Sequence, residues 1–257
     1  MTVETWARQE QEKAFAYHRG VTSFPDKLSR VEARITAACR RAGRPREEVR
    51  LMGVSKMHPA ESLAEAARAG LALFGENRVQ EFDAKRDRLR ELNVSGAQVH
   101  LIGHLQSNKS ARAAEIFDGI DSIDSLRLAE RLNDAAGKLK KQLPVLLEIK
   151  LSNEPTKTGL SPEEPELKSL LERLPDLPHL ALRGLMTIAP LDENPEAARA
   201  CFRQLRALRD KLAPQDPNLD LRELSMGMSG DFEIAIEEGS TLVRIGTALF
   251  GERSASQ

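Results

Sequence analysis

Lys56 is the first residue of the chain whose type and setting point to chemistry. It follows an apolar run, Leu51 to Val54, and precedes a helix-like segment that opens at Pro59. This order predicts a buried strand, a short loop and an amphipathic helix, with Lys56 at the C-terminal end of the strand. Such a lysine is either a solvated charge or a functional amine, and most lysines are solvated. The interpretation therefore depends on what the other strand ends carry.

Two glycine-containing loops near the C-terminus have the composition of an anion site. The first, SMGMSG, precedes a helix-like segment, so its backbone N–H groups and the helix dipole would face a bound anion. An ordinary capped turn, with Ser229 or Asp231 as the N-cap, explains the same residues. In the second loop, RIGT, Gly246 and Thr247 follow the last apolar run. Together the loops predict a phosphate cup that contains Ser229, Gly246 and Thr247.

Arg244 lies inside the apolar run LVRIGTALFG. An unpaired buried charge is very costly, so this arginine needs either a structural ion pair or a ligand. Leu242, Arg244 and Gly246 share one face of a strand by its period of two. A lysine at one strand end with a phosphate cup opposite fits a phosphorylated aldehyde held as an imine. The imine requires a neutral amine, and burial lowers the pKa of lysine from about 10.4. These residues alone do not separate a cofactor from a sugar phosphate.

Strand-like and helix-like segments alternate along most of the chain. The expected strands are Val49–Lys56, Leu71–Asn77, Gln98–Gln106, Gly119–Asp124, Pro144–Leu151, Leu180–Ile188, Leu221–Met226 and Thr241–Phe250. The expected helices are Pro25–Gly43, Pro59–Ala69, Val79–Leu92, Lys109–Phe117, Leu126–Lys140, Pro162–Leu174, Pro195–Leu212 and Asp231–Glu238.

Strict alternation implies parallel strands, and eight of them favour an α/β fold of the (β/α)8 TIM-barrel type. The alternative is a doubly wound open sheet, which usually carries a glycine-rich first turn, and VSKMHP is not one. In a barrel, functional groups follow the C-terminal strand ends, and phosphate binds after strands 7 and 8. The loops SMGMSG and RIGT fall at those two places.

The composition limits the classes of function and the number of domains. Of 257 residues, 38 are Lys or Arg and 39 are Asp or Glu, so nothing suggests capture of nucleic acid or of an anionic membrane. No apolar run approaches the roughly 18 residues of a membrane span. The two cysteines, Cys39 and Cys201, form no CxxC motif, which favours a reduced cytoplasmic protein. We expect one domain, residues 1–257, in which residues 1–23 are an N-terminal helical extension.

The remaining polar residues at the strand ends are weaker candidates. His100 and His104 are four residues apart, but the sequence supplies no matching metal ligands, so we expect no metal site. Asp121 and Asp124 lack a partner motif for paired-carboxylate chemistry.

An ordered set of motifs resembles a known family. VSKMHPAE, FGENRVQE, HLIGHLQSNK, SIDS, KTGL, LRGLMTIAP and LSMGMSGDFEIAIEEGSTLVRIGTALFG resemble the pyridoxal phosphate homeostasis proteins, single-domain relatives of the alanine racemase barrel. The resemblance runs from about Val49 to Glu252 and implies an alanine racemase N-terminal-domain-like barrel. It implies pyridoxal 5′-phosphate (PLP) on Lys56, phosphate held by the SMGMS and RIGT loops, and Asn77 near the cofactor. It also implies that Arg244 lies close to the ring or the phosphate.

The family resemblance implies binding, storage and transfer of PLP without established catalysis, with PLP-dependent apoenzymes as potential recipients. The runner-up function is a PLP-dependent amino-acid racemase or decarboxylase. A racemase of this barrel type needs a second base, which resemblance to the racemases assigns to a tyrosine from a further domain. The single tyrosine here, Tyr17, lies upstream of the barrel. A third hypothesis is a class I aldolase in which Lys56 forms an imine with a sugar phosphate. Since no β-domain of the racemase type is present, we expect a monomer.

Overall fold

The computed structural model describes residues 23–152, 158–190, 192, 194–213 and 219–251. Apart from Ser23, the predicted N-terminal extension lies outside these residues. Ser23 is the N-cap of the first described helix: its hydroxyl accepts from the Asp26 N–H at 3.3 Å, and the Asp26 carboxylate accepts from the Ser23 N–H at 3.3 Å.

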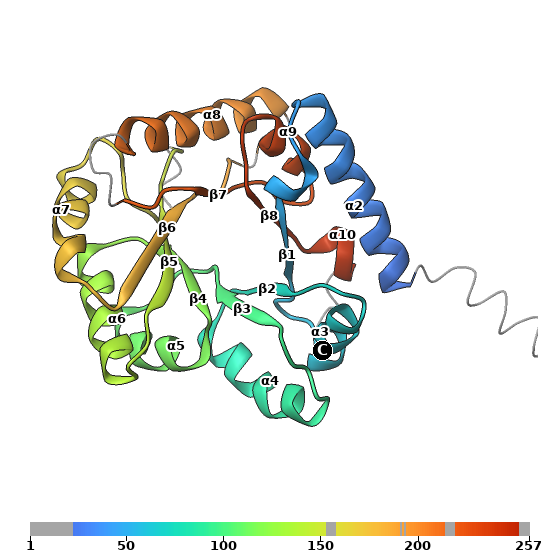
Figure 1. Ribbon diagram of the computed structural model, residues 1–257, viewed down its shortest axis with the longest axis horizontal. Coiled ribbons are helices and arrows are strands. Elements are labelled where there is room, and N and C mark those ends of the chain that lie inside the picture. The colour runs from blue at the N-terminus through green and yellow to red at the C-terminus, as the bar shows by residue number, and fades with distance from the viewer. Residues whose placement is uncertain (1–22, 153–157, 191, 193, 214–218, 252–257) are drawn as a thin grey trace, which may run out of the picture.

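Eight parallel strands close into a barrel in the order of the sequence (Figure 1). They are β1 (Arg50–Val54), β2 (Leu73–Glu76), β3 (Gln98–Leu101), β4 (Gly119–Ile123), β5 (Leu143–Glu148), β6 (Leu180–Met186), β7 (Glu223–Ser225) and β8 (Leu242–Ile245). The last strand pairs in parallel with the first, with Met52 opposite Arg244, which closes the ring. The predicted TIM barrel is thus confirmed, and the open-sheet alternative is wrong.

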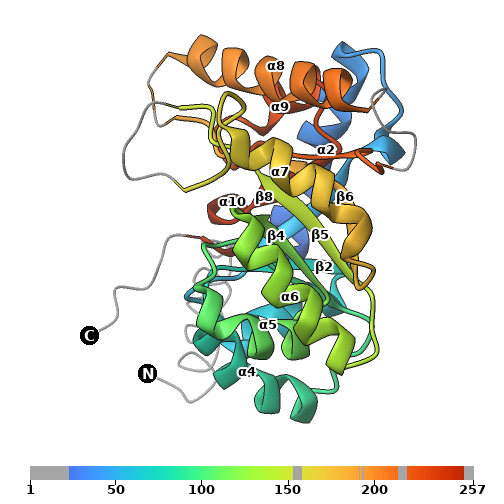
Figure 2. The same ribbon diagram turned by 90° about the vertical axis from the view of Figure 1, so that its left-hand side faces the viewer.

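Helices surround the barrel. They are α2 (Phe24–Arg41), α3 (Ala60–Arg68), α4 (Val79–Glu91), α5 (Ser110–Ile116), α6 (Leu126–Lys138), α7 (Pro165–Arg173), α8 (Pro195–Leu212), α9 (Phe232–Glu237) and α10 (Thr247–Phe250). Short 3-10 turns cover Arg46–Glu48, Ser107–Lys109 and Leu174–Asp176. Figure 2 shows α5, α6, α7 and α8 stacked in succession over one side. Helix α2 packs against α9 and α10, so a helix that precedes β1 completes the outer layer beside β8.

Several strands end earlier than the sequence predicted. Strand β1 ends at Val54 rather than Lys56, and β3 ends at Leu101 rather than Gln106. Strand β8 was predicted to run to Phe250 but ends at Ile245, because Gly246 leaves the extended region with φ −105° and ψ −81° and α10 follows at once. The strand ends therefore pass into turns sooner. Lys56, Asn77, Ser229 and Gly246 lie on those turns, whereas Arg244 lies within β8 and Thr247 begins α10.

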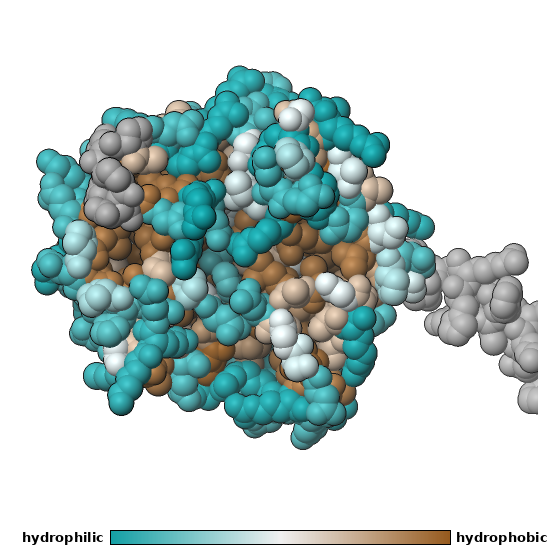
Figure 3. Space-filling view, viewed as in Figure 1, coloured by the Kyte–Doolittle hydropathy of each residue, from teal (hydrophilic) through white to brown (hydrophobic). Residues whose placement is uncertain are grey.

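The hydrophobic core lies mainly between the strands and the helices. Its largest fully buried side chains include Phe74, Phe117, Phe202 and Phe232. A second, small apolar cluster of Met52, Leu73 and Leu242 fills part of the barrel interior. Figure 3 shows hydrophobic surface gathered toward the middle of this face and hydrophilic side chains around its rim. Among the described residues, no helix is both long enough and apolar enough to cross a bilayer.

Candidate functional site

The predicted site residues gather on four neighbouring strands. Because all strands are parallel, their C-terminal ends meet at one rim of the barrel. Lys56 follows β1, Asn77 follows β2, Ser229 follows β7, and Gly246 follows β8. The order β7, β8, β1, β2 is continuous around the barrel. Segments nearly two hundred residues apart in the sequence thus meet on one half of the rim.

Lys56 lies in a tight turn directly after β1 and is partly buried. The turn is closed by a hydrogen bond from the His58 N–H to the Ser55 carbonyl at 3.1 Å. Within it, Met57 has a φ of 62°, a left-handed conformation that non-glycine residues rarely adopt. Ser55 is fully buried, and its hydroxyl donates to the Glu76 carboxylate at 2.8 Å. The backbone on both sides of Lys56 is therefore constrained.

Asn77 directly follows Glu76 at the end of β2 and is partly buried. The backbone after β3 packs tightly against it, since a Cβ added at Gly103 would lie 2.4 Å from the Asn77 carbonyl oxygen. The Gly103 carbonyl in turn accepts from the Ser122 hydroxyl at 2.7 Å. Glycine at position 103 thus permits a close approach that fixes the backbone of Asn77.

The two proposed phosphate loops lie side by side. The Ala248 N–H donates to the Ser229 hydroxyl oxygen at 3.4 Å, which joins the loop after β7 to the start of α10. A Cβ added at Gly246 would meet the Val54 carbonyl oxygen at 3.5 Å, an ordinary contact, so the protein's own packing does not demand glycine there.

Asp231 occupies the N-cap position of α9, as the capped-turn alternative predicted, but its side chain does not cap the helix. Its side chain makes no capping bond to α9 and instead accepts from the Met228 N–H at 2.6 Å. This N–H is therefore already engaged, and burial raises the pKa of the Asp231 carboxyl. The helix that follows is only six residues long. Ser229, Gly246 and Thr247 consequently remain the better candidates for an anion than the start of α9.

Arg244 is a buried cation within β8, with 3% of its surface exposed. Its Nη1 donates to the Ser225 hydroxyl at 2.7 Å and its Nη2 to the Thr187 carbonyl at 2.8 Å. Burial lowers the pKa of this guanidinium, whereas the carboxylates of Asp121, Asp231 and Glu148 favour its charged form. Two of the five guanidinium N–H groups are thus committed to neutral acceptors.

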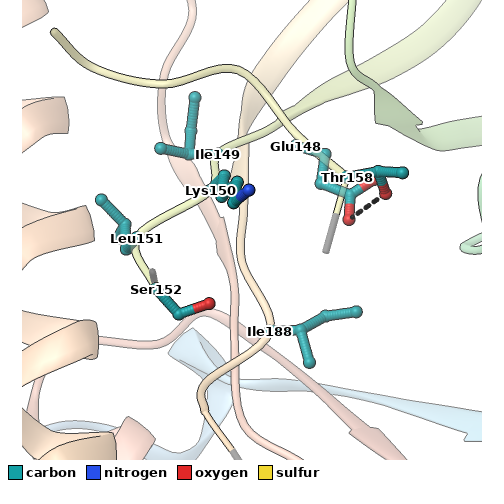
Figure 4. Close-up of a pocket in the computed structure, with 7 residues that line it drawn as sticks. All are labelled: Glu148, Ile149, Lys150, Leu151, Ser152, Thr158 and Ile188. Carbon is teal, nitrogen blue, oxygen red and sulfur yellow. Dashed lines mark hydrogen bonds between the residues drawn. The ribbon is translucent and has the colours of Figure 1, made fainter. Parts of the chain in front are cut away.

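A cavity of about 180 Å³ opens at the C-terminal end of β5, which lies across the barrel from β1 (Figure 4). Glu148 lines it, with one carboxylate oxygen accepting from the Thr158 hydroxyl at 3.4 Å. The other oxygen and the Ser152 hydroxyl have no hydrogen-bond partner within the described part of the chain. Burial and the nearby Asp124 raise the pKa of Glu148. The sequence analysis missed Glu148, because one glutamate within an apolar run has no distinguishing pattern.

The two histidines of the third segment do not share a site. His100 Nδ1 lies 2.9 Å from the Asp121 carboxylate inside the barrel, and His104 Nδ1 lies 2.8 Å from the Asp124 carboxylate at the rim. Asp121 and Asp124 therefore have partners that no sequence motif revealed. Across the residues with assigned positions, no three His, Cys, Asp or Glu side chains are grouped to hold a metal ion.

Comparison with known proteins defines the class of barrel to which the chain belongs. Residues 27–254 match the family described as "Alanine racemase, N-terminal domain". Alanine racemase from Clostridium difficile has the same fold, with a TM-score of 0.65 at 17% identity over 88% of this chain and 57% of the racemase. The closed barrel is thus of the alanine racemase N-terminal type.

Relatives with higher sequence identity define the family within this class of barrel. The pyridoxal phosphate homeostasis protein of Aquifex aeolicus is 47% identical over 89% of this chain and 97% of its own length. The pyridoxal phosphate homeostasis protein of Escherichia coli K12 is 44% identical over 90% of this chain and 97% of its own length. PipY of Synechococcus elongatus, solved with PLP bound, has a TM-score of 0.79 at 41% identity, covering 89% of this chain and all of PipY. The chain belongs to the family of pyridoxal phosphate homeostasis proteins.

Proposed function

We propose that this protein binds PLP through a Schiff base on Lys56 and acts in PLP homeostasis by binding, storing and transferring the cofactor. The observation that carries the proposal is the convergence on adjacent strands of one partly buried lysine and two touching, hydroxyl-bearing loops. The PLP-bound relative PipY, 41% identical, supports the choice of PLP over a sugar phosphate.

The residues at the rim fit the chemistry of PLP. Its aldehyde condenses with a primary amine, and Lys56 supplies one at the end of β1. Its phosphate needs N–H and O–H donors, which Ser229 and Thr247 offer where the loops after β7 and β8 meet. Asn77, held by the close packing of Gly103, has an amide group that suits a polar group of the ring.

Arg244 is better placed for the ring than for the phosphate. Its guanidinium extends from β8 toward Ser225 and Thr187, on the side of β7 and β6, whereas the phosphate loops meet at Ser229 and Ala248. A guanidinium donates hydrogen bonds and gives up no proton at neutral pH. At the ring nitrogen it would therefore leave that atom unprotonated, which suits storage of the aldehyde better than chemistry that needs a strong electron sink.

A racemase or decarboxylase is the second candidate function, and one observation favours it. His104, oriented by Asp124 at 2.8 Å, is a half-exposed imidazole at the rim and could serve as a base in place of the tyrosine that racemases use. Tyr17 lies outside the described residues. We expect no turnover of any common amino acid by the pure protein. Turnover that Lys56→Ala and His104→Ala both abolish would establish the enzyme instead.

Titration with PLP, followed by absorption, tests the proposed function. The wild type should develop a near-visible band that Lys56→Ala lacks, while Lys109→Ala, which removes another lysine at the same rim, should keep it. A protein that stays colourless with PLP but forms a reducible adduct with a sugar phosphate would be the aldolase. A band of equal strength in Lys56→Ala would assign the linkage to another amine.

We further propose a cytoplasmic location, a monomeric state and PLP-dependent apoenzymes as recipients. The two cysteines, Cys39 and Cys201, are both buried and form no CxxC motif, which fits a reducing compartment. The monomer is supported by the lengths of the matched proteins, since the chain spans 97% of the Aquifex aeolicus relative but only 57% of the racemase. Transfer to an apoenzyme fits a cofactor held through a reversible linkage.

A further inference from the structure

The turn that carries Lys56 is tied to helix α4 by charged side chains. Lys85 Nζ donates to the Ser55 carbonyl at 3.1 Å, to the Glu76 carboxylate at 2.9 Å and to the Glu81 carboxylate at 2.8 Å. The same Glu81 oxygen accepts from the Met57 N–H. The residues on both sides of Lys56 are thus held by one interconnected set of ion pairs.

The ion pairs of Lys85 are more deeply buried than the other charged contacts of α4. The side chains of Glu76 and Lys85 are 0% and 11% exposed, whereas the Arg88–Glu61 pair between α3 and α4 is about half exposed at both ends. One oxygen of Glu76 has no hydrogen-bond partner in the described part of the chain. Buried charges of this kind are costly to maintain and weak evidence for stability, so a role beyond stability is indicated.

Met57 provides an independent observation. Its φ of 62° costs free energy in any residue other than glycine, and a turn with positive φ at its third position usually carries Gly or Asn there. Met57 is 52% exposed, so little burial offsets that cost. The strained conformation is therefore maintained by the contacts around it, and Glu81 holds the Met57 N–H itself.

We propose that Lys85 and Glu81 are positioning residues that fix the strained turn and thereby aim the Lys56 amine at the bound aldehyde. They act through Ser55 and Met57 and do not touch the cofactor. The inference rests on the proposed function, since it concerns the efficiency of the covalent linkage at Lys56. The inference predicts that losing the Lys85 or Glu81 contacts weakens the covalent part of PLP binding and leaves the non-covalent part unchanged.

The test compares Lys85→Met and the milder Glu81→Gln with Arg88→Met. Arg88 is the matched control, because it lies on the same helix and pairs with α3 but does not contact the Lys56 turn. Each variant is titrated with PLP and with pyridoxine 5′-phosphate, which has an alcohol in place of the aldehyde and reports non-covalent binding alone. Circular dichroism and melting temperature report folding.

Lys85→Met should weaken PLP binding by about 10- to 100-fold, the scale of a misplacement of about 1 Å at a reacting group. Its affinity for pyridoxine 5′-phosphate should stay within about twofold of wild type, since no phosphate or ring contact changes. Glu81→Gln should show the same pattern to a smaller degree, and Arg88→Met should not show it. Adding Met57→Gly to Lys85→Met should recover part of the loss, because glycine adopts positive φ without strain.

The outcomes separate this inference from the proposed function. If the wild type binds both ligands equally and gives no borohydride-stable adduct on Lys56, the proposed function fails. If the wild type forms the adduct but folded Lys85→Met and Glu81→Gln keep its preference for PLP over the alcohol, the positioning role is wrong. Equal losses for both ligands, or no recovery with Met57→Gly, would also overturn it, since either would show a general role in folding.

Discussion

Arg244 provides the sharpest test of how the barrel interior is organised. Replacing it by Met removes the donors to the Ser225 hydroxyl and the Thr187 carbonyl, both buried. It also removes the positive charge that Asp121, Asp231 and Glu148 face. Hydrogen bonds from a charged donor contribute about 1.5–3 kcal/mol each, and breaking a buried charge pair costs about 3–5 kcal/mol. Removing the buried guanidinium's own desolvation cost offsets part of this loss.

We therefore expect Arg244→Met to lower the free energy of unfolding by about 3 kcal/mol at neutral pH. For a domain of this size that corresponds to a fall of about 6–12 °C in melting temperature. The measurement is urea denaturation of the wild type and the variant at several values of pH, with the PLP-free protein used throughout.

The loss should depend on pH. Burial raises the pKa values of Glu148 and Asp231 in the folded wild type, and loss of the Arg244 charge should raise them further. A carboxyl with a raised folded pKa binds its proton more tightly in the folded than in the unfolded state, so its contribution to stability falls as pH rises from about 4. The difference between wild type and Arg244→Met should therefore be smaller at pH 5 than at pH 8.

A surface arginine serves as the control. Arg222 is 82% exposed and pairs with Asp220, so Arg222→Met should cost far less than Arg244→Met. If Arg244→Met costs no more than Arg222→Met, or if its cost does not change with pH, Glu148 and Asp231 do not depend on Arg244 in the way described.

Three further predictions concern the surface, the phosphate and the assembly. Asp220→Asn should lower stability by about 1 kcal/mol near neutral pH, because the Arg222 hydrogen bond lowers the pKa of Asp220 to about 2. That stability is present above the unfolded pKa of about 3.9 and is lost as pH falls toward 2, so urea midpoints that differ equally at pH 2 and pH 7 would contradict it. Ser229→Ala and Thr247→Val should each weaken PLP binding by about tenfold, and Gly246→Val by more, and all three should reduce the preference for PLP over pyridoxal. If titration shows that the preference is unchanged, the phosphate binds elsewhere. Light scattering should give a monomer mass, and a dimer independent of concentration would refute this.

The fold was predictable because it depends on patterns that are local in the sequence. The alternation of apolar runs with helix-like segments predicts eight parallel strands, and the structure has them in that order. The strand ends were less predictable. The apolar run after Arg244 reads as one strand, but Gly246 breaks it, and the last four residues of that run form α10.

The parts of the site that escaped prediction are contacts between strands. His100 pairs with Asp121 and His104 with Asp124, at separations of 21 and 20 residues. Two adjacent parallel strands in register bring residues at near-equal separations together. These two pairs could therefore be predicted only if the register of β3 against β4 were known. The Lys85 contact to Ser55 has the same origin: it depends on how α4 packs on β1 and β2, which no local pattern encodes.

Chemical reduction followed by peptide mapping tests the central proposal most directly. Protein incubated with PLP is treated with borohydride, which makes the Schiff base permanent, and is then digested and analysed by mass spectrometry. We predict that the pyridoxyl phosphate group lies on the peptide that contains Lys56, and that Lys56→Ala gives no adduct at matched PLP concentration. An adduct on another lysine of the wild type, retained in full by Lys56→Ala, would contradict the assignment of PLP to the end of β1.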